Sequence, residues 1–363
     1  MHIVFVAPRF HTNQYFWVKA LQDAGHSVSF WVRKKANTEE HALIEPRLIM
    51  SRPQGRSGRR RLYREFASLL SSERPDAVVV RNPGEPFGRA VLAPLRKLGI
   101  PVVLYSQRPL NERPPWYRRV ATTLLQRRMG KCDARAPWIT PIRGGRSDEV
   151  RAPRNWHYIP FVMEPDSEAE QEHATRVWCP GGVRRILMVG KYMRRKNHLL
   201  LVQALHELSR RYPVSLELVG GTGRDDYKTV YRDVTAYVSE HELDWVTLTP
   251  TIPYAELQKK MRNYDLFVLP SRDEAVGVSL LEAMGKGLPV VCSTTAGARD
   301  YVEHAGNGRI FESDSLTDLR DQLDVLLSDP AILPAMGRRS LELVRTVHSP
   351  EAFLDRFIPL LNH

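Results

Sequence analysis

The sequence has few cysteines and no long apolar run. Its three cysteines, Cys132, Cys179 and Cys292, lie far apart in the chain. Their number and spacing argue against a disulfide framework and a cysteine-based zinc site, and they indicate a reducing compartment. No stretch approaches the ~20 apolar residues that span a bilayer as a helix. The N-terminus, MHIVFVAPRF, lacks a basic leader before its short apolar run, so we expect no signal peptide.

Acidic residues are scarce in one part of the chain. The whole sequence has 53 Lys and Arg against 41 Asp and Glu, a net charge of +12. Residues 51–155 alone hold 23 basic and 8 acidic residues, which leaves the rest slightly acidic. A local basic excess favours an anionic partner. Nucleic acid, an anionic membrane surface and a phosphorylated substrate all remain open on this evidence.

The composition is that of a globular protein. The chain has 363 residues, of which 42% are hydrophobic and 26% are charged. These values argue against a disordered or fibrous chain, and the length favours two domains.

Strand and helix patterns alternate along both halves of the chain. In the first half, short apolar runs predict strands, and amphipathic stretches predict helices at 14–24 and 87–98; the strands are 2–7, 27–32, 77–80, 101–105 and 138–141. The Gly-, Ser- and Arg-rich residues 52–64 are expected to form a loop.

A second series starts near residue 185. Its predicted strands are 185–189, 215–219, 245–248, 265–270 and 289–292, and its predicted helices are 197–211, 226–240, 253–263, 279–286, 316–328 and 334–347. The pair Asp225-Asp226 is interpreted as a helix N-cap.

Two such series predict an α/β protein with two doubly wound, Rossmann-like domains that face across a cleft. We expect domains at 1–165 and 166–345, joined within 156–184, where an acidic run occupies 168–172. Residues 346–363 are expected to form a C-terminal helix that packs back on the first domain. Ligands of such sheets bind at the carboxyl ends of the strands.

The most informative segment is LPSRDEAVGVSLLEAMGKGLPVV, residues 269–291. A strand ends before Glu274, and a helix starts near Gly277. The amides of Gly277, Val278 and Ser279 predict an anion site suited to a diphosphate. Glu282, two turns into the helix, is placed to accept hydrogen bonds from two vicinal hydroxyls, as on a ribose. The alternative is a solvated Glu282 and a Glu274 favoured only by the helix dipole.

A basic loop follows the strand at 185–189. Lys191 and Lys196 lie five residues apart after the strand-end Gly190, and both could neutralise phosphate groups. The alternative is a solvated basic loop.

Together these two segments resemble the retaining glycosyltransferases of family 4, which have the two-domain GT-B fold. That family carries Gly-Arg-x4-Lys-Gly and, later, Pro-Ser-x2-Glu-Gly-Phe-Gly-x3-Leu-Glu-Ala-Met-x2-Gly-x-Pro-Val-Val. This sequence matches the second pattern at Pro270, Ser271, Glu274, Gly277, Leu281, Glu282, Ala283, Met284, Gly287, Pro289, Val290 and Val291. The resemblance is clear over about residues 183–320.

The resemblance implies roles for these residues. Lys191 and Lys196 would bind the donor diphosphate, and Glu282 the donor ribose. Glu274 would lie by the hydroxyls of the donor sugar. The remaining donor-binding candidates are Gly190, the amides of Val276, Gly277, Val278 and Ser279, and Thr251 with Ile252 near the base.

Three departures from the family pattern affect the implied roles. Lys191 replaces an arginine and loses its planar fork. The first-domain loop has His11, Thr12 and Asn13 where paired glycines are usual, and we take these residues as acceptor-side candidates. Gln107 stands where the family often has a histidine, and an amide can bind a sugar hydroxyl but cannot titrate.

The mechanism that the resemblance implies needs no cofactor beyond the nucleotide diphosphate sugar that is the donor. The transition state is oxocarbenium-like, and cations stabilise the leaving diphosphate. No Asp-x-Asp metal clamp occurs in the expected place, so we expect no metal requirement. In the family, the leaving phosphate is thought to take the acceptor's proton on the same face, with retention.

The basic region 59–131 mixes cations with aromatic residues, as in RRRLYR at 59–64 and PPWYRR at 114–119. Such segments lie well on anionic membranes. We therefore expect a cytoplasmic protein, peripheral on the inner membrane face, with a glycan or lipid-linked acceptor. A solvated basic face is the alternative, and without a nucleic-acid motif a nucleic-acid partner is not expected.

The function predicted is glycosyl transfer from a UDP- or GDP-sugar in cell-envelope or polysaccharide synthesis. The alternatives are another enzyme on the same frame, such as a nucleotide-sugar epimerase, and a non-catalytic binder of nucleotide sugars or nucleic acid.

Overall fold

The computed structural model describes residues 1–35, 44–52, 54–110, 136–144 and 155–362. Its internal contacts divide the chain into two units, Met1–Val162 together with Pro350–His363, and Met163–Ser349. The expected domain boundaries, after 165 and after 345, lie close to these.

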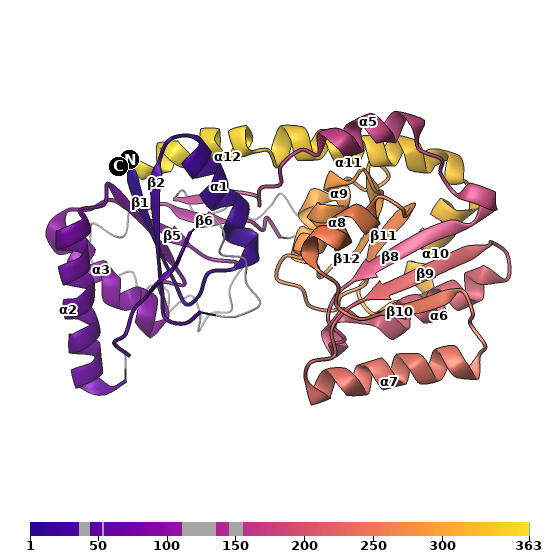
Figure 1. Ribbon diagram of the computed structural model, residues 1–363, viewed down its shortest axis with the longest axis horizontal. Helices are drawn as coiled ribbons and strands as arrows, with labels where there is room; N and C mark the ends of the chain where they lie inside the picture. Colours follow the sequence, from indigo (N-terminus) through magenta and orange to yellow (C-terminus); the bar gives the residue numbers. More distant parts are fainter. Residues whose placement is uncertain (36–43, 53, 111–135, 145–154, 363) are drawn as a thin grey trace. The chain divides into compact units, whose positions relative to one another are not determined.

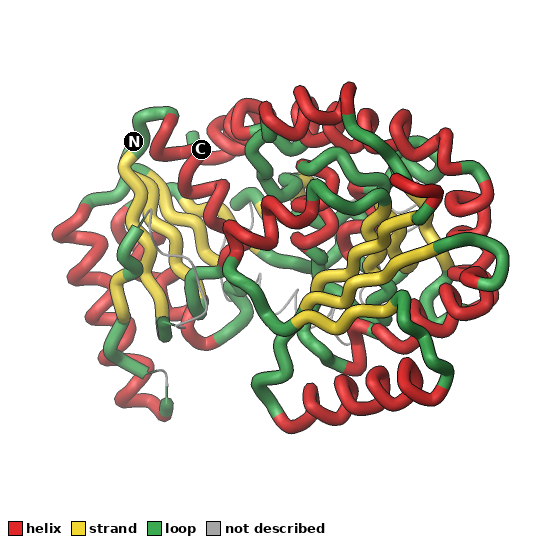
Figure 2. The backbone as a smooth tube through the Cα atoms, turned by 45° about the vertical axis from the view of Figure 1, so that its right-hand side comes forward, coloured by secondary structure: helices red, strands yellow, loops and turns green. Residues whose placement is uncertain are grey.

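The first unit is built on a parallel sheet. Its strands, as far as the chain is described, are β1 (His2–Ala7), β2 (Ser27–Val32), β3 (Arg47–Leu48), β4 (Ala77–Arg81), β5 (Val102–Tyr105), β6 (Trp138–Thr140) and β7 (Trp156–Tyr158), in the order β3-β2-β1-β4-β5-β6-β7. The helices are η1 (Thr12–Gln14), α1 (Tyr15–Asp23), α2 (Gly55–Glu73), α3 (Pro86–Leu98), α12 (Pro350–Phe357) and η6 (Ile358–Leu361). Helices flank the strands of this sheet (Figure 2), so the central strands are buried and apolar, as Val78–Val80 are.

The last helix of the chain belongs to the first unit. In Figure 1, α12 lies beside α1, although the whole second unit separates them in sequence. The ring of Phe353 stacks on Trp17 at 5.4 Å, and Phe357 stacks on Phe5 at 6.5 Å. The core of the first unit is therefore completed only when the end of the chain returns to it.

The second unit has the same architecture. Its described strands are β8 (Arg184–Val189), β9 (Val214–Val219), β10 (Val246–Thr249), β11 (Leu266–Leu269), β12 (Val290–Ser293) and β13 (Gly308–Phe311), in the parallel order β10-β9-β8-β11-β12-β13. The helices are α5 (Ser167–Thr175), η2 (Pro180–Gly182), η3 (Arg194–Lys196), α6 (His198–Ser209), α7 (Asp225–Glu240), α8 (Tyr254–Met261), α9 (Val278–Gly285), η4 (Gly297–Tyr301), α10 (Leu316–Ser328), η5 (Pro330–Ile332) and α11 (Leu333–Val347). Leucines of α6 and α10 form much of its core.

Each sheet reverses its strand order at one point, between β1 and β4 and between β8 and β11. This confirms the prediction of two Rossmann-like sheets. The loops that leave the carboxyl ends of these four strands flank the place where ligands bind in such folds. Residues 8–14 and 190–197 are two of these loops.

The prediction of a loop at 52–64 is wrong, because helix α2 begins at Gly55. The reason is the four-residue spacing of Leu62, Phe66 and Leu70, which form the buried face of α2 with Gly58. The ring of Phe66 lies 6.1 Å from that of Trp31 and 5.4 Å from that of Phe87. Arginine is a good helix former, so the basic residues between them fit the exposed face.

The proposed linker also contains regular structure. Its acidic run lies in α5, where Asp166 caps the helix by accepting a hydrogen bond from the Ala169 amide at 3.0 Å. Acidic side chains in the first turn are favoured by the helix dipole. The N-cap of α7 is Arg224 rather than the Asp225-Asp226 pair, which occupies the first turn of that helix.

Candidate functional site

The centre of the candidate site is an ion pair in the second unit. Lys196 ends η3, after β8, and Glu274 follows the neighbouring strand β11. The Lys196 ammonium lies 2.6 Å from the Glu274 carboxylate, and the two side chains are only 11% and 12% exposed. The Arg195 guanidinium lies 2.5 Å from the same carboxylate and donates to the Asp273 carbonyl at 3.0 Å. Two cations thus converge on one carboxylate at the point where the strand order reverses.

Burial of Lys196 lowers the pKa of its ammonium group, and Glu274 acts against that shift. A buried cation without its carboxylate would lose much of its charge. Glu274 therefore keeps Lys196 available as a positive group in a nearly dry site.

A glycine makes room for Lys196. A Cβ atom on Gly190 would lie 3.3 Å from both Cδ and Cε of Lys196. The ring of His198 donates a hydrogen bond from Nε2 to the Gly190 carbonyl at 3.1 Å, and burial lowers the pKa of His198 to about 4. A neutral histidine thus fixes the loop on which the lysine stem lies.

Asn197 stands where the family pattern has a glycine. Its φ is 60°, in the left-handed region that asparagine tolerates better than most residues. Its side-chain amide donates to the Asp314 carboxylate at 3.1 Å. The asparagine therefore keeps the backbone shape of the pattern and adds a tether to the loop before α10.

The start of α9 lies beside this ion pair. Gly277 has φ 87°, and a Cβ on it would lie 2.5 Å from Leu269 Cδ2 and 3.3 Å from Glu274 Cγ. The amide of Ala298 stabilises this turn by donating a hydrogen bond to the Val276 carbonyl at 2.6 Å. Because first-turn amides have no acceptor within their own helix, the amides of Val278 and Ser279 are suited to binding an anion.

Glu282 lies further along α9, and no cation of the described chain forms an ion pair with it. It accepts a hydrogen bond from the Tyr254 hydroxyl, while burial raises the pKa of Glu282 to about 7. Lys286, the cation that acts on it, forms its ion pair with Asp166 instead. Glu282 is thus a carboxyl group with spare acceptor capacity, which suits hydroxyl donors.

Two of the remaining donor candidates follow another strand of the same sheet. Thr251 and Ile252 follow β10, and a Cβ on Gly221 would lie 2.6 Å from Thr251 Oγ1. Lys191 is exposed, and no ion pair joins it to another residue in the described chain. The structure brings Gly190, Lys196, Glu274 and Gly277 into contact, whereas the side chain of Lys191 is exposed beside them in the chain.

The acceptor-side candidates lie in the first unit, around an arginine that sequence reasoning missed. Arg81, at the end of β4, donates to Gln107 Oε1 at 3.0 Å. Burial, together with Arg81, lowers the pKa of His11. Asn13 lies in η1, and its buried Oδ1 has no hydrogen-bond partner among the described residues. Thr12 begins η1.

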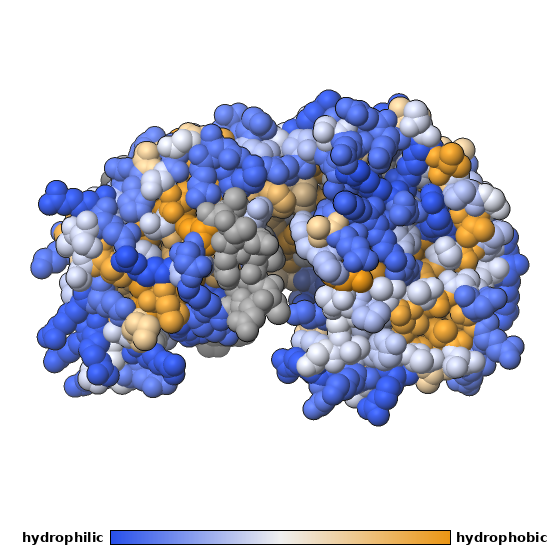
Figure 3. Space-filling model, viewed as in Figure 1, coloured by the Kyte–Doolittle hydropathy of each residue, from blue (hydrophilic) through white to orange (hydrophobic). Residues whose placement is uncertain are grey.

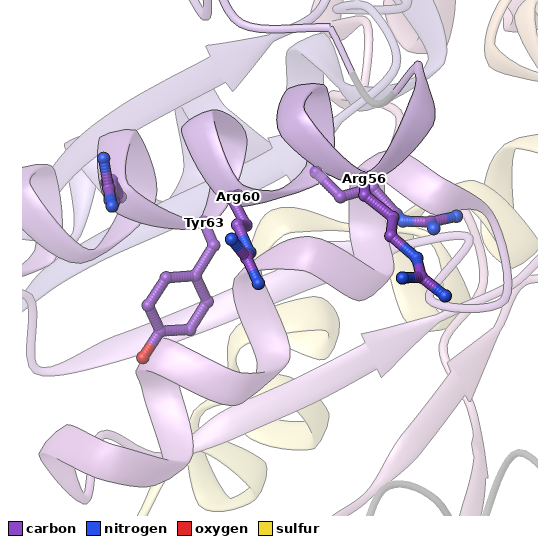
Figure 4. Close-up of a pocket in the computed structure, with 5 residues that line it drawn as sticks. Arg56, Arg60 and Tyr63 are labelled. Carbon is purple, nitrogen blue, oxygen red and sulfur yellow. The ribbon is translucent and has the colours of Figure 1, made fainter.

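Part of the predicted basic region forms the exposed side of α2. The α2 basic surface comprises Arg56, Arg59, Arg60, Tyr63 and Arg64, which line a hollow of about 410 Å³. Arg60 and Tyr63 project from the same side of the helix (Figure 4), and hydrophilic side chains cover most of this part of the unit (Figure 3). Residues 111–131 of the predicted region lie outside the described residues.

Sequence reasoning missed three residues of these sites, Arg81, Arg195 and Tyr254. A signal existed for Arg81, because it is the only charged residue in the run Ala77–Arg81 and occupies its carboxyl end. Arg195 lies in a run of three basic residues, and nothing in the run distinguishes it from Arg194. Tyr254 follows the predicted base-binding pair by two positions.

Two family models match the chain. One, described as glycosyl transferases group 1, matches residues 176–341, and the other, described as glycosyltransferase family 4, matches residues 15–136. The donor-side candidates lie within the first of these ranges. On the acceptor side, Arg81 and Gln107 lie within the second range, and His11, Thr12 and Asn13 precede it.

The chain is similar to curated glycosyltransferases over part of their length. A D-inositol 3-phosphate glycosyltransferase of Pseudarthrobacter chlorophenolicus is 30% identical over 162 residues, which are 43% of this chain and 37% of that protein. A GDP-mannose-dependent alpha-(1-6)-phosphatidylinositol monomannoside mannosyltransferase of Mycolicibacterium smegmatis is 29% identical over 186 residues, 49% of this chain and 46% of that protein. The chain thus matches less than half the length of these relatives.

The likeness of fold extends over the whole chain. A crystal structure of a glycosyltransferase from Rickettsia africae has a TM-score of 0.78 to it, covering 99% of this chain and 97% of that one at 13% identity. Such low identity shows the fold alone. With the two family models it supports one conclusion: the chain belongs to glycosyltransferase family 4 and has the GT-B fold.

Proposed function

We propose that this protein transfers a sugar, with retention, from a UDP- or GDP-sugar to a glycan or lipid-linked acceptor in cell-envelope or polysaccharide synthesis. The observation that carries the proposal is the nearly buried Lys196–Glu274 pair beside the start of α9. A cation, a carboxylate and free helix amides at one strand end suit a diphosphate joined to a sugar.

In this proposal the donor lies along the carboxyl edge of the second sheet. Glu282 accepts hydrogen bonds from the ribose hydroxyls, and Thr251 and Ile252 lie by the base. The diphosphate binds the α9 amides and Lys196, with exposed Lys191 as a further cation. Glu274 accepts hydrogen bonds from the donor sugar. When Lys196 binds the diphosphate, Arg195 keeps its ion pair with Glu274.

The chemical step breaks the bond between the anomeric carbon and the diphosphate oxygen, which keeps the electron pair. The acceptor hydroxyl oxygen forms the new bond on the same face, and its proton passes to the leaving phosphate. Positive groups fixed before the reaction stabilise the charge that develops on the diphosphate. Lys196 and the α9 amides supply this stabilisation, so we expect activity to survive a chelator.

The acceptor in this proposal binds the first unit through His11, Thr12, Asn13 and Gln107. Gln107 is held in place, because it accepts from Arg81 and its amide nitrogen donates to the Tyr105 hydroxyl at 3.2 Å. It can therefore orient a sugar hydroxyl but cannot carry a proton through the reaction.

Peripheral binding to an anionic membrane forms part of the proposal. The α2 basic surface has exposed apolar neighbours, because Glu65 of α2 accepts from the Met50 amide at 2.9 Å, and Met50 and Leu48 are 74% and 41% exposed. Cations beside apolar side chains suit a phospholipid surface. In the described helices, none is both long and apolar enough to cross a membrane.

The test is calorimetry of the purified chain with UDP, GDP, ADP and their sugars, followed by assignment of the product anomer by NMR. We expect one nucleotide series to bind, Lys196→Ala to weaken it about tenfold or more, and the exposed neighbour Arg194→Ala to have little effect. Failure of every nucleotide to bind, or a product of inverted configuration, would contradict the proposal.

The same samples separate the alternatives. An epimerase would convert the nucleotide sugar without acceptor, although the family models and the relatives described above do not favour this activity. A nucleic-acid binder would bind oligonucleotides with an affinity that Lys196→Ala leaves unchanged.

A further inference from the structure

Arg81 is a buried cation in the first unit, and its partners in the described chain are neutral. It ends the central strand β4, at the point where the strand order reverses, and is only 8% exposed. Its guanidinium donates to Gln14 Oε1 at 3.2 Å and to Gln107 Oε1 at 3.0 Å, and it lies over the ring of Tyr105. Across the described residues no carboxylate pairs with it. A buried charge left with neutral partners is costly, which points to an anion that completes the site.

The groups around Arg81 are built to fix its orientation. Gln14 is completely buried, and Gln107 is anchored on the Tyr105 hydroxyl. The amide nitrogen of Gln14 and the amide oxygen of Asn13 are buried without a hydrogen-bond partner in the described chain. The guanidinium is thus oriented by two neutral amides that leave its charge uncompensated.

Further positive groups surround the same strand ends. Arg9 donates from Nε to His11 Nε2 at 3.0 Å, so His11 accepts there as a neutral ring. The amide of Lys34, after β2, donates to the Pro8 carbonyl at 3.2 Å, which places Lys34 beside this loop. Burial, together with Arg81, Arg9 and Lys34, lowers the pKa of His11 to about 3. The three charged groups that lower the pKa of His11 are all cations, and a dianion would be attracted to such a site.

We propose that the carboxyl end of the first sheet binds a phosphate ester of the acceptor, with Arg81 as the residue that selects it. The proposal rests on the transfer activity proposed above and narrows its acceptor to phosphorylated compounds. Arginine presents a planar fork that matches two phosphate oxygens, and it stays charged when buried. Arg9 and Lys34 would balance the second charge of a monoester.

The test measures binding of glycerol 3-phosphate and glucose 6-phosphate to the full chain, with glycerol and glucose as uncharged controls. We expect only the phosphates to bind, and Arg81→Gln to weaken them about tenfold or more while UDP and GDP affinity stays within about twofold. Arg81→Lys should restore part of the binding, and Arg89→Gln, at an exposed arginine of α3, should leave it unchanged. Equal binding of the uncharged controls, or parallel loss of nucleotide affinity in Arg81→Gln, would overturn the proposal.

A measurement on the unmodified protein covers the case in which Arg81→Gln does not fold. Bound phosphate should shift the NMR signals of the His11 ring and raise its pKa, since an anion offsets the neighbouring cations. Unmoved His11 signals at saturating phosphate ester would refute the site. Binding to phosphatidylcholine vesicles with and without phosphatidic acid shows whether the phosphate ester belongs to a lipid. If soluble glycerol 3-phosphate competes with vesicle binding, and Arg81→Gln abolishes this competition, lipid and soluble ester bind the same site. If phosphates bind through Arg81 but no nucleotide binds, the anion site stands and the transfer activity fails.

Discussion

Lys196 and Glu274 form an ion pair in which each side chain is nearly nine-tenths buried. Such a pair is costly to break from one side, because the remaining charge stays buried without its partner. Arg195 also contacts Glu274, so the cost of losing each partner differs.

This asymmetry is measurable by urea denaturation. Lys196→Met should lower the free energy of unfolding of the second unit by about 1–3 kcal/mol, less than for an isolated buried pair, because Arg195 still neutralises Glu274. Glu274→Gln should cost more, because two cations then lose their carboxylate. The double variant should be more stable than the sum of the single effects implies, and strictly additive effects would show that the pair is not coupled.

Nucleotide affinity should depend on pH through Glu282. Burial raises the pKa of this carboxyl from 4.5 to about 7, so the folded protein holds the proton through that interval. Ribose hydroxyls donate to the ionised form. Affinity for a bound nucleotide sugar, whose phosphates do not titrate here, should therefore rise as pH increases through about 7 and then level off. Calorimetry between pH 6 and 8 should show that the nucleotide-sugar affinity of Glu282→Gln does not change with pH. If the affinity of both proteins changes equally with pH, a group other than Glu282 causes the dependence.

The same pKa shift has the opposite sign for stability. Because the native state binds the proton more tightly than the unfolded chain, the contribution of Glu282 falls as pH rises from 4.5 towards 7. The unfolding free energy of the wild type relative to Glu282→Gln should decrease over this range. A difference that increases with pH would contradict the raised pKa of Glu282.

Gly277→Ala should disturb the start of α9. The backbone φ of 87° is strained for any side chain, and the new Cβ would lie 2.5 Å from Leu269. We expect a loss of about 2 kcal/mol in the free energy of unfolding, together with weaker nucleotide binding. Gly223→Ala is the matched control, because a Cβ there meets nothing within 4 Å. Equal stability of the two variants would show that the turn does not need glycine.

Phe353→Ala should destabilise the first unit although it lies near the end of the chain. The ring is 2% exposed and stacks on Trp17, and removal of a buried phenylalanine costs about 3–5 kcal/mol. Thermal unfolding followed by tryptophan fluorescence should show the loss, with exposed Glu351→Ala unchanged. If Phe353→Ala were as stable as the wild type, α12 would not form part of this core.

Charge reversal on α2 tests the membrane surface. Replacing Arg56, Arg59, Arg60 and Arg64 by glutamate should abolish sedimentation with vesicles rich in phosphatidylglycerol, since each cation near such a surface contributes about 1 kcal/mol. The arginines are exposed, so the fold should survive, as circular dichroism can verify. Undiminished sedimentation would exclude α2 as the contact.

The donor-side residues of α9 and the turn before it can be predicted from the sequence, because they are close together in the chain. The helix start at Gly277 and the positions of Glu274 and Glu282 follow from one segment of strand, turn and helix. The backbone conformation of Asn197 could not be predicted from the sequence, because its φ of 60° depends on the fold of the loop after β8. The Gly, Ser and Arg content of residues 52–64 predicts a loop, because composition does not reveal a buried helix face that packs on residues distant in sequence, such as Trp31 and Phe87.

Local periodicity and short-range spacing are sufficient to predict the alternation of strands and helices, the two Rossmann-like sheets and the strand, turn and helix of residues 269–291. Which charges meet depends instead on long-range packing. The pairing of strands distant in sequence brings Arg195, and not Arg194, to Glu274. It also brings Arg81 to Gln14, Gln107 and His11. The return of α12 to α1 was likewise decided by long-range packing, since an apolar helix face is satisfied only by the core that it reaches.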